Sequence, residues 1–315
     1  MKQIIKKYLK KLPYLKGLYG HIELLKKQTE GNFSNKQQGQ DWVPSGHFYS
    51  PIPNLDDVKK RENIIFDKSS NKIEGIDLRE DVQLLFFEKL AEYYKDMPFG
   101  EKKREGLRYF FENTAFSYAD GIFLHTIIRH LKPKRIIEVG SGYSSCVTLD
   151  TNEIFFNNAI ECTFIEPYPQ LLESLIKEDD KKNVKIISKN LQEVDLEEFS
   201  KLEAGDILFI DSTHVSKIDS DVNYIFFKLL PYLKKGVYIH FHDIFFPFEY
   251  PKNWIYEGRA WNEDYLMRAF LQYNNSFEIV FFIDYMQNFH ENLIREKMGL
   301  ALRNGGGGIW IEKVG

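Results

Sequence analysis

Cysteine is scarce in this chain of 315 residues, which contains only Cys146 and Cys162. Neither residue lies in a Cys-x-x-Cys pair or beside a histidine at the spacing of zinc ligands. We therefore expect neither a disulfide framework nor a structural zinc site. The scarcity of cysteine favours a reducing compartment.

Long apolar runs are also missing. No run approaches the roughly 18 residues that a membrane-spanning helix requires. The N-terminus is basic, but it has no uninterrupted apolar stretch followed by small residues, so we expect no signal peptide. These absences together predict a cytoplasmic protein.

Positive charge is not in excess over the whole chain. The formal net charge is −4, which gives no reason to expect a nucleic-acid partner. The charge is unevenly distributed, however. Residues 1–27 contain eight lysines and one acid and carry +7, so the remainder carries −11. The sequence predicts a basic extension joined to an acidic body.

Within the extension, apolar residues recur at helical spacing among the lysines from Ile4 to Leu12, and Pro13 interrupts the pattern. A basic amphipathic segment of this kind can lie on the inner face of an anionic membrane. It can equally pack on its own domain or on a second subunit, so a homo-oligomer stays open. Residues 28–46 are polar and read as a linker.

The chain divides into three parts by pattern. Residues 1–46 form the basic extension and linker, and residues 47–115 form an accessory or cap region that includes an amphipathic helix after Asp77. Residues 116–315 alternate short apolar strands with helical stretches and are expected to form the ligand-binding domain.

The third part predicts an α/β fold with a doubly wound, Rossmann-like sheet. Helices are expected at Pro169–Lys177, Leu196–Leu202 and Val222–Leu233. Two late strands, Phe277–Phe282 and Gly308–Glu312, could form an antiparallel edge pair. Buried parallel strands are expected at Arg135–Val139, Cys162–Ile165, Val184–Ile187, Asp206–Ile210 and Val237–Phe241.

The loop after the first strand contains two glycines, Gly140 and Gly142. They permit a tight turn and a close backbone approach to a ligand between strand and helix. A dinucleotide fingerprint requires Gly or Ala at the sixth position of G-x-G-x-x-G, where this chain has Ser145.

The second strand ends at Glu166, which is placed to accept hydrogen bonds from both ribose hydroxyls of an adenosine-type ligand. A solvated charge at a strand end is the alternative reading of this residue alone. After the third strand, residues 190–192 could frame an adenine ring.

Several motifs together resemble a bacterial family of class I S-adenosylmethionine (SAM)-dependent methyltransferases, often linked to surface-polysaccharide genes. The motifs are EVGSGYSS, FIEP, GDILFIDSTHV, VYIHFHDIFFPFEYP and WNEDYL, and the resemblance covers about residues 47–315. The resemblance implies methyl transfer to a hydroxyl of a small-molecule or saccharide acceptor. It also implies SAM contacts from Glu138, Gly140, Ser141, Gly142, Tyr143, Glu166 and Asp211.

Methylating a hydroxyl requires removal of its proton, and the ends of the fourth and fifth strands offer two ways to do so. In one, a divalent metal such as Mg²⁺ is bound by Asp211, His242 and Asp243. Asp211 and Asp243 are similar in position to the ligands of catechol-type enzymes, whereas His242 departs from that pattern, because histidine is a less usual magnesium ligand. In the other, His214 or His242 is the general base and Asp243 orients it. We expect His240 to be a hydrogen-bonded interior histidine.

Other segments near these motifs have two readings each. Trp261 and residues 245–254 could line an acceptor pocket suited to a sugar ring, or could belong to the core. Tyr118 and Asp120 are placed to close over the SAM site, Asn262 is expected to cap a helix, and Gly305–Gly308 is interpreted as a flexible turn.

Two rival functions remain at this stage. A nicotinamide-dependent oxidoreductase shares the sheet, but it would require the third loop glycine and a catalytic pair such as Tyr-x-x-x-Lys, which we do not find. The other rival function is that of a non-catalytic, SAM-binding assembly protein, attached to a membrane through residues 1–27.

Overall fold

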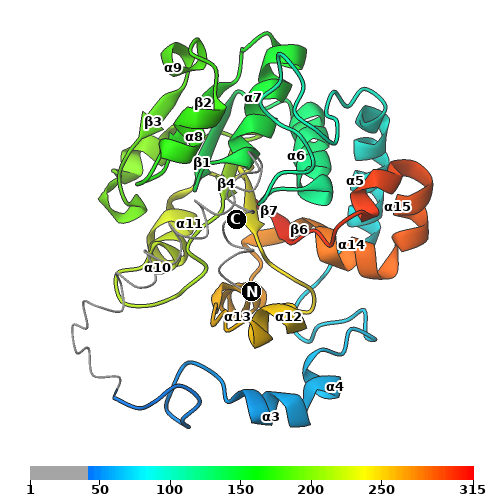
Figure 1. Cartoon of the computed structure of the whole chain (residues 1–315), viewed down its shortest axis with the longest axis vertical. Helices are drawn as coiled ribbons and strands as arrows, with labels where there is room; N and C mark the ends of the chain where they lie inside the picture. The colour runs from blue at the N-terminus through cyan, green and yellow to red at the C-terminus, as the bar shows by residue number, and fades with distance from the viewer. Residues whose placement is uncertain (1–41) are drawn as a thin grey trace, which may run out of the picture. The chain divides into compact units, whose positions relative to one another are not determined.

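The computed structural model describes residues 42–315 (Figure 1). The chain separates into two units, residues 1–54 and 55–315. The expected helix in the basic extension lies outside the described residues. The accessory region from Leu55 onward belongs to the same unit as the sheet. None of the helices within 42–315 is long and apolar enough to cross a membrane.

The centre of the second unit is a seven-stranded sheet with the order β3-β2-β1-β4-β5-β7-β6. Strands β1 to β5 are parallel, while β7 runs antiparallel to both β5 and β6. The predicted fold class and the antiparallel edge pair are confirmed. The bounds are β1 Arg135–Val139, β2 Glu161–Ile165, β3 Lys185–Ile187, β4 Ile207–Ile210, β5 Tyr238–His242, β6 Phe277–Phe282 and β7 Gly308–Lys313.

The helices up to the fourth strand follow the predicted alternation. They are α3 Leu55–Lys60, α4 Glu62–Ile65, α5 Glu80–Tyr94, α6 Tyr118–Leu131, α7 Tyr143–Phe156, α8 Gln170–Leu175 and α9 Asp180–Asn183. Residues Leu191–Glu193 (η1) and Leu196–Lys201 (η2) are 3₁₀ helices, so the helix expected at 196–202 forms in the tighter geometry.

The helices after β4 are α10 Asp221–Tyr224, α11 Leu230–Tyr232, α12 Lys252–Tyr256, α13 Glu263–Leu271, α14 Ile283–Phe289 and α15 Glu291–Met298, with a 3₁₀ turn η4 at Gly299–Leu302. In Figure 1 the accessory helix α5 lies beside α15, and the two helices are in contact.

The single helix expected at Val222–Leu233 is interrupted. A π-helical segment, η3 (Ile225–Leu229), separates α10 from α11. Pro231 explains the interruption, because it has no N–H to donate and its ring collides with the carbonyl four residues earlier. The helix widens locally instead of ending.

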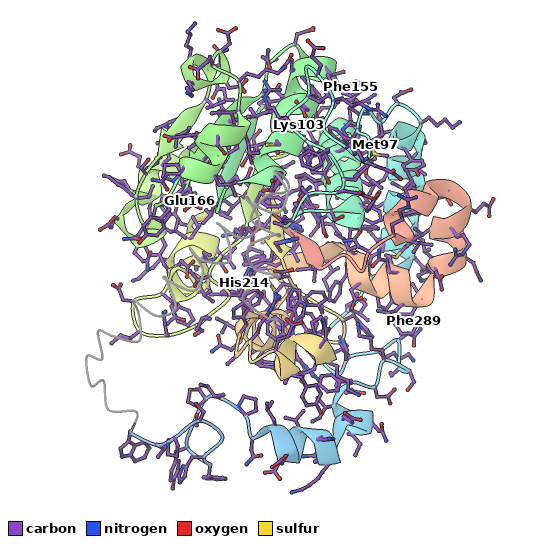
Figure 2. The ribbon with its side chains drawn as sticks, in the orientation of Figure 1. Met97, Lys103, Phe155, Glu166, His214 and Phe289 are labelled. Atoms are coloured by element: carbon purple, nitrogen blue, oxygen red, sulfur yellow. The ribbon has the colours of Figure 1, made fainter. Side chains whose placement is uncertain are left out.

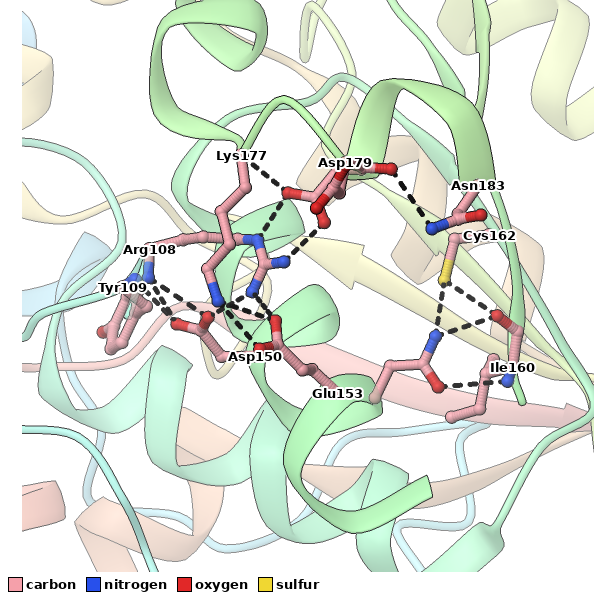
Figure 3. Close-up of polar contacts among 11 residues, drawn as sticks. Arg108, Tyr109, Asp150, Glu153, Ile160, Cys162, Lys177, Asp179 and Asn183 are labelled. Carbon is pink, nitrogen blue, oxygen red and sulfur yellow. Dashed lines mark hydrogen bonds and ion pairs between the residues drawn. The ribbon is translucent and has the colours of Figure 1, made fainter. Parts of the chain in front are cut away.

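A buried ion network ties the segment before α6 to α7 and α9 (Figure 3). The Arg108 guanidinium donates to Asp150 Oδ1 at 2.7 Å and to Asp180 Oδ2 at 2.7 Å, and it pairs with Glu153 at 2.8 Å. Asp150 also accepts the backbone N–H groups of Arg108 and Tyr109. The network holds in place the chain that leads into α6.

We expect Arg108→Ala to destabilise the protein by about 3–5 kcal/mol, because it leaves Asp150 and Asp180 as buried carboxylates without their cation. Urea denaturation measures the loss. The matched control is Arg295→Ala, which breaks an exposed i,i+4 pair with Glu291 and should change stability by less than about 0.5 kcal/mol. Equal losses in the two variants would contradict the role given to Arg108.

Candidate active site

The loop after β1 is held by a close approach between two strand ends. Gly140 has φ +78°, and a Cβ on it would lie 1.9 Å from the carbonyl oxygen of Asp211. Its N–H donates to Ile165 O at 3.0 Å, and the N–H of Asp211 donates to Val139 O at 2.8 Å. Only glycine fits this position, for both its conformation and its space.

Glu138 lies under this loop and is fully buried. Its Oε1 accepts hydrogen bonds from Ser144 Oγ at 2.5 Å and Ser145 Oγ at 2.9 Å, while its Oε2 has no partner within residues 42–315. Burial raises the pKa of Glu138 to about 8. Ser145 also accepts the N–H of Gly142, so the residue that replaces the third glycine supports both the loop and the carboxyl group.

A cavity of about 400 Å³ opens at the carboxyl ends of β1, β2 and β4. Gly140, Glu166, Asp211 and residues 190–192 all line it, as the sequence led us to expect. Glu138, Ser141, Gly142 and Tyr143 are not among its lining residues. Figure 2 shows where Glu166 lies relative to His214.

Glu166 is already oriented by the backbone. Its Oε2 accepts the N–H of Ser141 at 3.3 Å, and its Oε1 accepts the N–H of Tyr168 at 2.8 Å. Each carboxylate oxygen can accept a further hydrogen bond, so the group can still serve two hydroxyls.

His214 lies between three carboxylates. Its Nδ1 is 2.9 Å from Glu263 Oε2, and its Nε2 is 3.3 Å from Asp211 Oδ1 and 3.7 Å from Asp243 Oδ2. Burial lowers the pKa of His214, but Asp211 and Glu263 outweigh it and raise the pKa to about 10. The imidazole is therefore protonated at neutral pH in the protein alone.

Glu263 is the partner that sequence reasoning missed. It is 1% exposed, and its Oε2 also accepts a hydrogen bond from Ser212 Oγ at 2.8 Å. The N–H groups of Asn262 and Glu263 donate to His214 O, which brings the start of α13 to this loop. The segment WNEDYL shows an acid at the start of a helix, but not that this acid is buried beside His214. Asn262 is the N-cap residue of α13, as predicted, but its side chain does not cap the helix, because Asn262 Oδ1 accepts the N–H of Ser216 instead.

His242 and Asp243 lie at the end of β5, with Nε2 of the histidine 3.7 Å from Asp243 Oδ1. Burial lowers the pKa of His242, but Asp243, Asp211 and Asp120 raise it above its usual value. Asp120, from the first turn of α6, joins this charge cluster, and burial raises its pKa to about 6. Asp243 thus lies between two histidines, and the predicted catalytic residues share one site.

His214 and Asp243 both adopt a left-handed backbone, with φ of 58° and 54°. This region is sparsely populated by residues other than glycine, and such strain is concentrated at functional sites. Asp243 directly follows β5, and His214 lies in the loop after β4; the side chains of the two residues approach to 3.7 Å.

Two predictions near β5 need correction. His240 is interior, stacked on Phe209 at 4.4 Å, but neither ring nitrogen has a hydrogen-bond partner among the described residues. Within the run 305–308, Gly306, Gly307 and Gly308 are packed and do not form a flexible turn, whereas Gly305 is exposed. A Cβ on Gly306, Gly307 or Gly308 would lie 2.5–2.7 Å from a neighbouring side chain. These glycines let β7 pass beside Asp120 and Asp243.

Aromatic side chains border the charge cluster. Trp261 packs on His214 with ring centroids 4.4 Å apart, and Trp254 meets Trp261 edge-on at 5.4 Å. Arg259 lies over the Trp254 ring at 4.1 Å. Phe245 and Tyr250 form a small buried cluster with these rings. The predicted aromatic segment therefore lies next to a predicted catalytic residue.

Within residues 42–315, no group of three or more His, Cys, Asp or Glu side chains is arranged to hold a metal ion. The magnesium site at Asp211, His242 and Asp243 stays a prediction.

Comparison with known proteins agrees with this geometry. Residues 137–244 match the family model described as a methyltransferase domain. An uncharacterised protein of Archaeoglobus fulgidus is 38% identical over 165 residues, which span 51% of this chain and 73% of the relative.

Solved structures with a similar fold include the O-methyltransferase TomG of Streptomyces achromogenes in complex with SAM. It is 14% identical, with coverage of 83% and 96% of the two chains and a TM-score of 0.42. The Podospora anserina methyltransferase PaMTH1 is 16% identical, with coverage of 84% and 99% and a TM-score of 0.43.

Glu263→Gln should lower the pKa of His214 from about 10 toward its usual value of 6.5, because the substitution removes one of the carboxylates beside the ring. The stability that the protonated ring contributes is complete below pH 6.5 and is lost as the pH rises through about 10. In the variant this contribution should be smaller, and its loss should be complete at a lower pH.

NMR titration of labelled histidine and urea denaturation across pH measure the two effects. Glu291→Gln, on the exposed face of α15, is the control and should leave the His214 titration unchanged. An unaltered His214 pKa in Glu263→Gln would show that Glu263 does not set it.

Proposed function

We propose that this protein is a SAM-dependent O-methyltransferase that transfers a methyl group to a hydroxyl of a small-molecule or saccharide acceptor. One observation carries the proposal: the cavity at the ends of β1, β2 and β4 shares Asp211 with the histidine–carboxylate cluster. A cofactor cavity and a proton-accepting group thus lie side by side.

The lining residues fit the chemistry of SAM. The Gly140 turn brings backbone close to the cavity, and the Glu166 carboxylate can accept the ribose hydroxyls. Glu138 is not a lining residue, but its buried Oε2 has no partner among the described residues and suits a further donor such as an ammonium group. When bound, SAM supplies a methyl carbon on a positively charged sulfur, and its transfer to the hydroxyl oxygen leaves an uncharged thioether.

His214 is the residue that we assign as proton acceptor. Its Nδ1–H donates to Glu263, which fixes the ring and presents Nε2 toward Asp211 and Asp243. This is the arrangement in which a carboxylate orients a general base. A cation bound in the cavity that Asp211 lines would offset the carboxylate charge and lower the pKa of His214 toward neutrality. His242, joined through Asp243, is the alternative acceptor.

The aromatic border supports an acceptor with a ring. Trp261 covers one face of His214, and Trp254 and Arg259 continue this surface away from the charge cluster. Sugar rings present apolar C–H faces that pack on indole rings, so a saccharide hydroxyl placed here would face Asp243 and His214. A cytoplasmic acceptor of this class agrees with the predicted reducing compartment.

Isothermal titration calorimetry with SAM and NAD tests the cofactor. We expect SAM binding, and Glu166→Gln should weaken it about tenfold or more, because a hydrogen bond to a charged acceptor is lost. Glu161→Gln is the control, since Glu161 begins the same strand and pairs with Arg135 on the surface. Binding of NAD without binding of SAM would overturn the proposal.

Transfer of labelled methyl groups to a panel of hydroxylated acceptors tests the reaction. His214→Gln should reduce the rate about 10²–10⁴-fold while SAM binding is retained. The pKa of His214, followed by NMR, should fall more with SAM than with S-adenosylhomocysteine, whose sulfur is uncharged.

Normal turnover by His214→Gln combined with loss of turnover in His242→Gln would reassign the proton acceptor to His242. Loss of activity on chelation, restored by Mg²⁺, would assign the step to a metal at Asp211, His242 and Asp243.

A further inference from the structure

Aromatic side chains are gathered and exposed in the segment Trp42–Ile52. Trp42 is 80% exposed, Phe48 90% and Tyr49 63%. Tyr49 has ring contacts with both others, at 5.3 Å to Trp42 and 5.2 Å to Phe48. The rings therefore form one apolar patch, which is costly to leave in water.

The loop is built by its own hydrogen bonds. Gly46 N–H donates to Ile52 O at 3.2 Å, Ser50 N–H to His47 O at 2.8 Å, and His47 N–H to Pro44 O at 3.1 Å. Gly46 supplies the left-handed turn with φ +80°. Backbone hydrogen bonds thus define the loop. The side chains of Trp42, Phe48 and Tyr49 remain exposed on it.

Charge in the sequence identifies the surface that this patch fits. Residues 1–54 contain nine lysines and three acids and carry +6, whereas residues 55–315 carry −10. An anionic surface attracts the first segment and repels the body. Indole and phenol rings prefer the interface between lipid headgroups and acyl chains, where one edge is apolar and the other hydrated.

We propose that the Trp42–Ile52 loop is a membrane-docking element that inserts its aromatic side chains into the interface of an anionic lipid bilayer. The lysines of residues 1–27 supply the electrostatic attraction, and the rings supply the apolar contact. Two weak signals of different kinds are what reversible peripheral attachment requires. This inference does not depend on the reaction that the active site catalyses.

Co-sedimentation of the full chain with vesicles tests the proposal. Binding is expected to vesicles of equal phosphatidylcholine and phosphatidylglycerol, to be absent with phosphatidylcholine alone, and to weaken as salt is raised. The triple variant Trp42→Ala, Phe48→Ala, Tyr49→Ala should bind at least about tenfold more weakly. Lys→Gln replacement of the eight lysines in residues 1–27 should abolish the preference for anionic lipid.

The matched control removes three exposed aromatics of the body, Phe227, Tyr232 and Tyr273, and should bind vesicles like the parent protein. Brominated lipid should quench tryptophan emission in the parent and not in Trp42→Phe. Equal binding by the two triple variants would overturn the proposal. The proposal would also be overturned if the parent protein did not bind vesicles but formed a dimer in sedimentation equilibrium, and if the first triple variant abolished that dimer. The patch would then join two copies of the chain.

Discussion

The close approach of Gly140 to the carbonyl oxygen of Asp211 is the constraint on which the site depends. It joins the ends of β1 and β4, and each strand end donates or accepts a backbone hydrogen bond across the junction. A side chain at residue 140 would push the two ends apart. The cavity that both residues line, and the contact of Asp211 with His214, would be lost together.

The protein contains two buried ionic networks, one around Arg108 and one around His214, and they differ in how fully their polar atoms are paired. Around Arg108, every buried side-chain nitrogen and oxygen of Arg108, Asp150 and Asp180 has a hydrogen-bond partner, which stabilises the fold. Around His214, carboxylates outnumber cations, and Glu138, Glu263 and Asp120 each retain a buried oxygen without a partner among the described residues. That second arrangement is costly for folding and useful for binding a cation, which is typical of a functional site.

The strand pattern could be predicted from the sequence because buried parallel strands are continuous apolar runs. The strand-end residues Gly140, Glu166 and Asp211 followed from that pattern, since parallel strands end at one edge. The role of Glu263 could not be predicted, because it lies 49 residues after His214 and meets it only through the turn before α13. The packed glycines of 306–308 were likewise misread, because close approach depends on neighbours far away in the sequence.

The sequence by itself determined the fold class, the cofactor loop and the split of charge between residues 1–54 and the body. These properties follow from local periodicity and composition. Tertiary structure decided which carboxylate contacts His214 Nδ1 and brought Asp120 into the cluster. It also buried the Glu138 carboxyl group and thereby raised its pKa. Such properties depend on distance and on exclusion of water, and both arise only when the strand ends and helix starts are brought together.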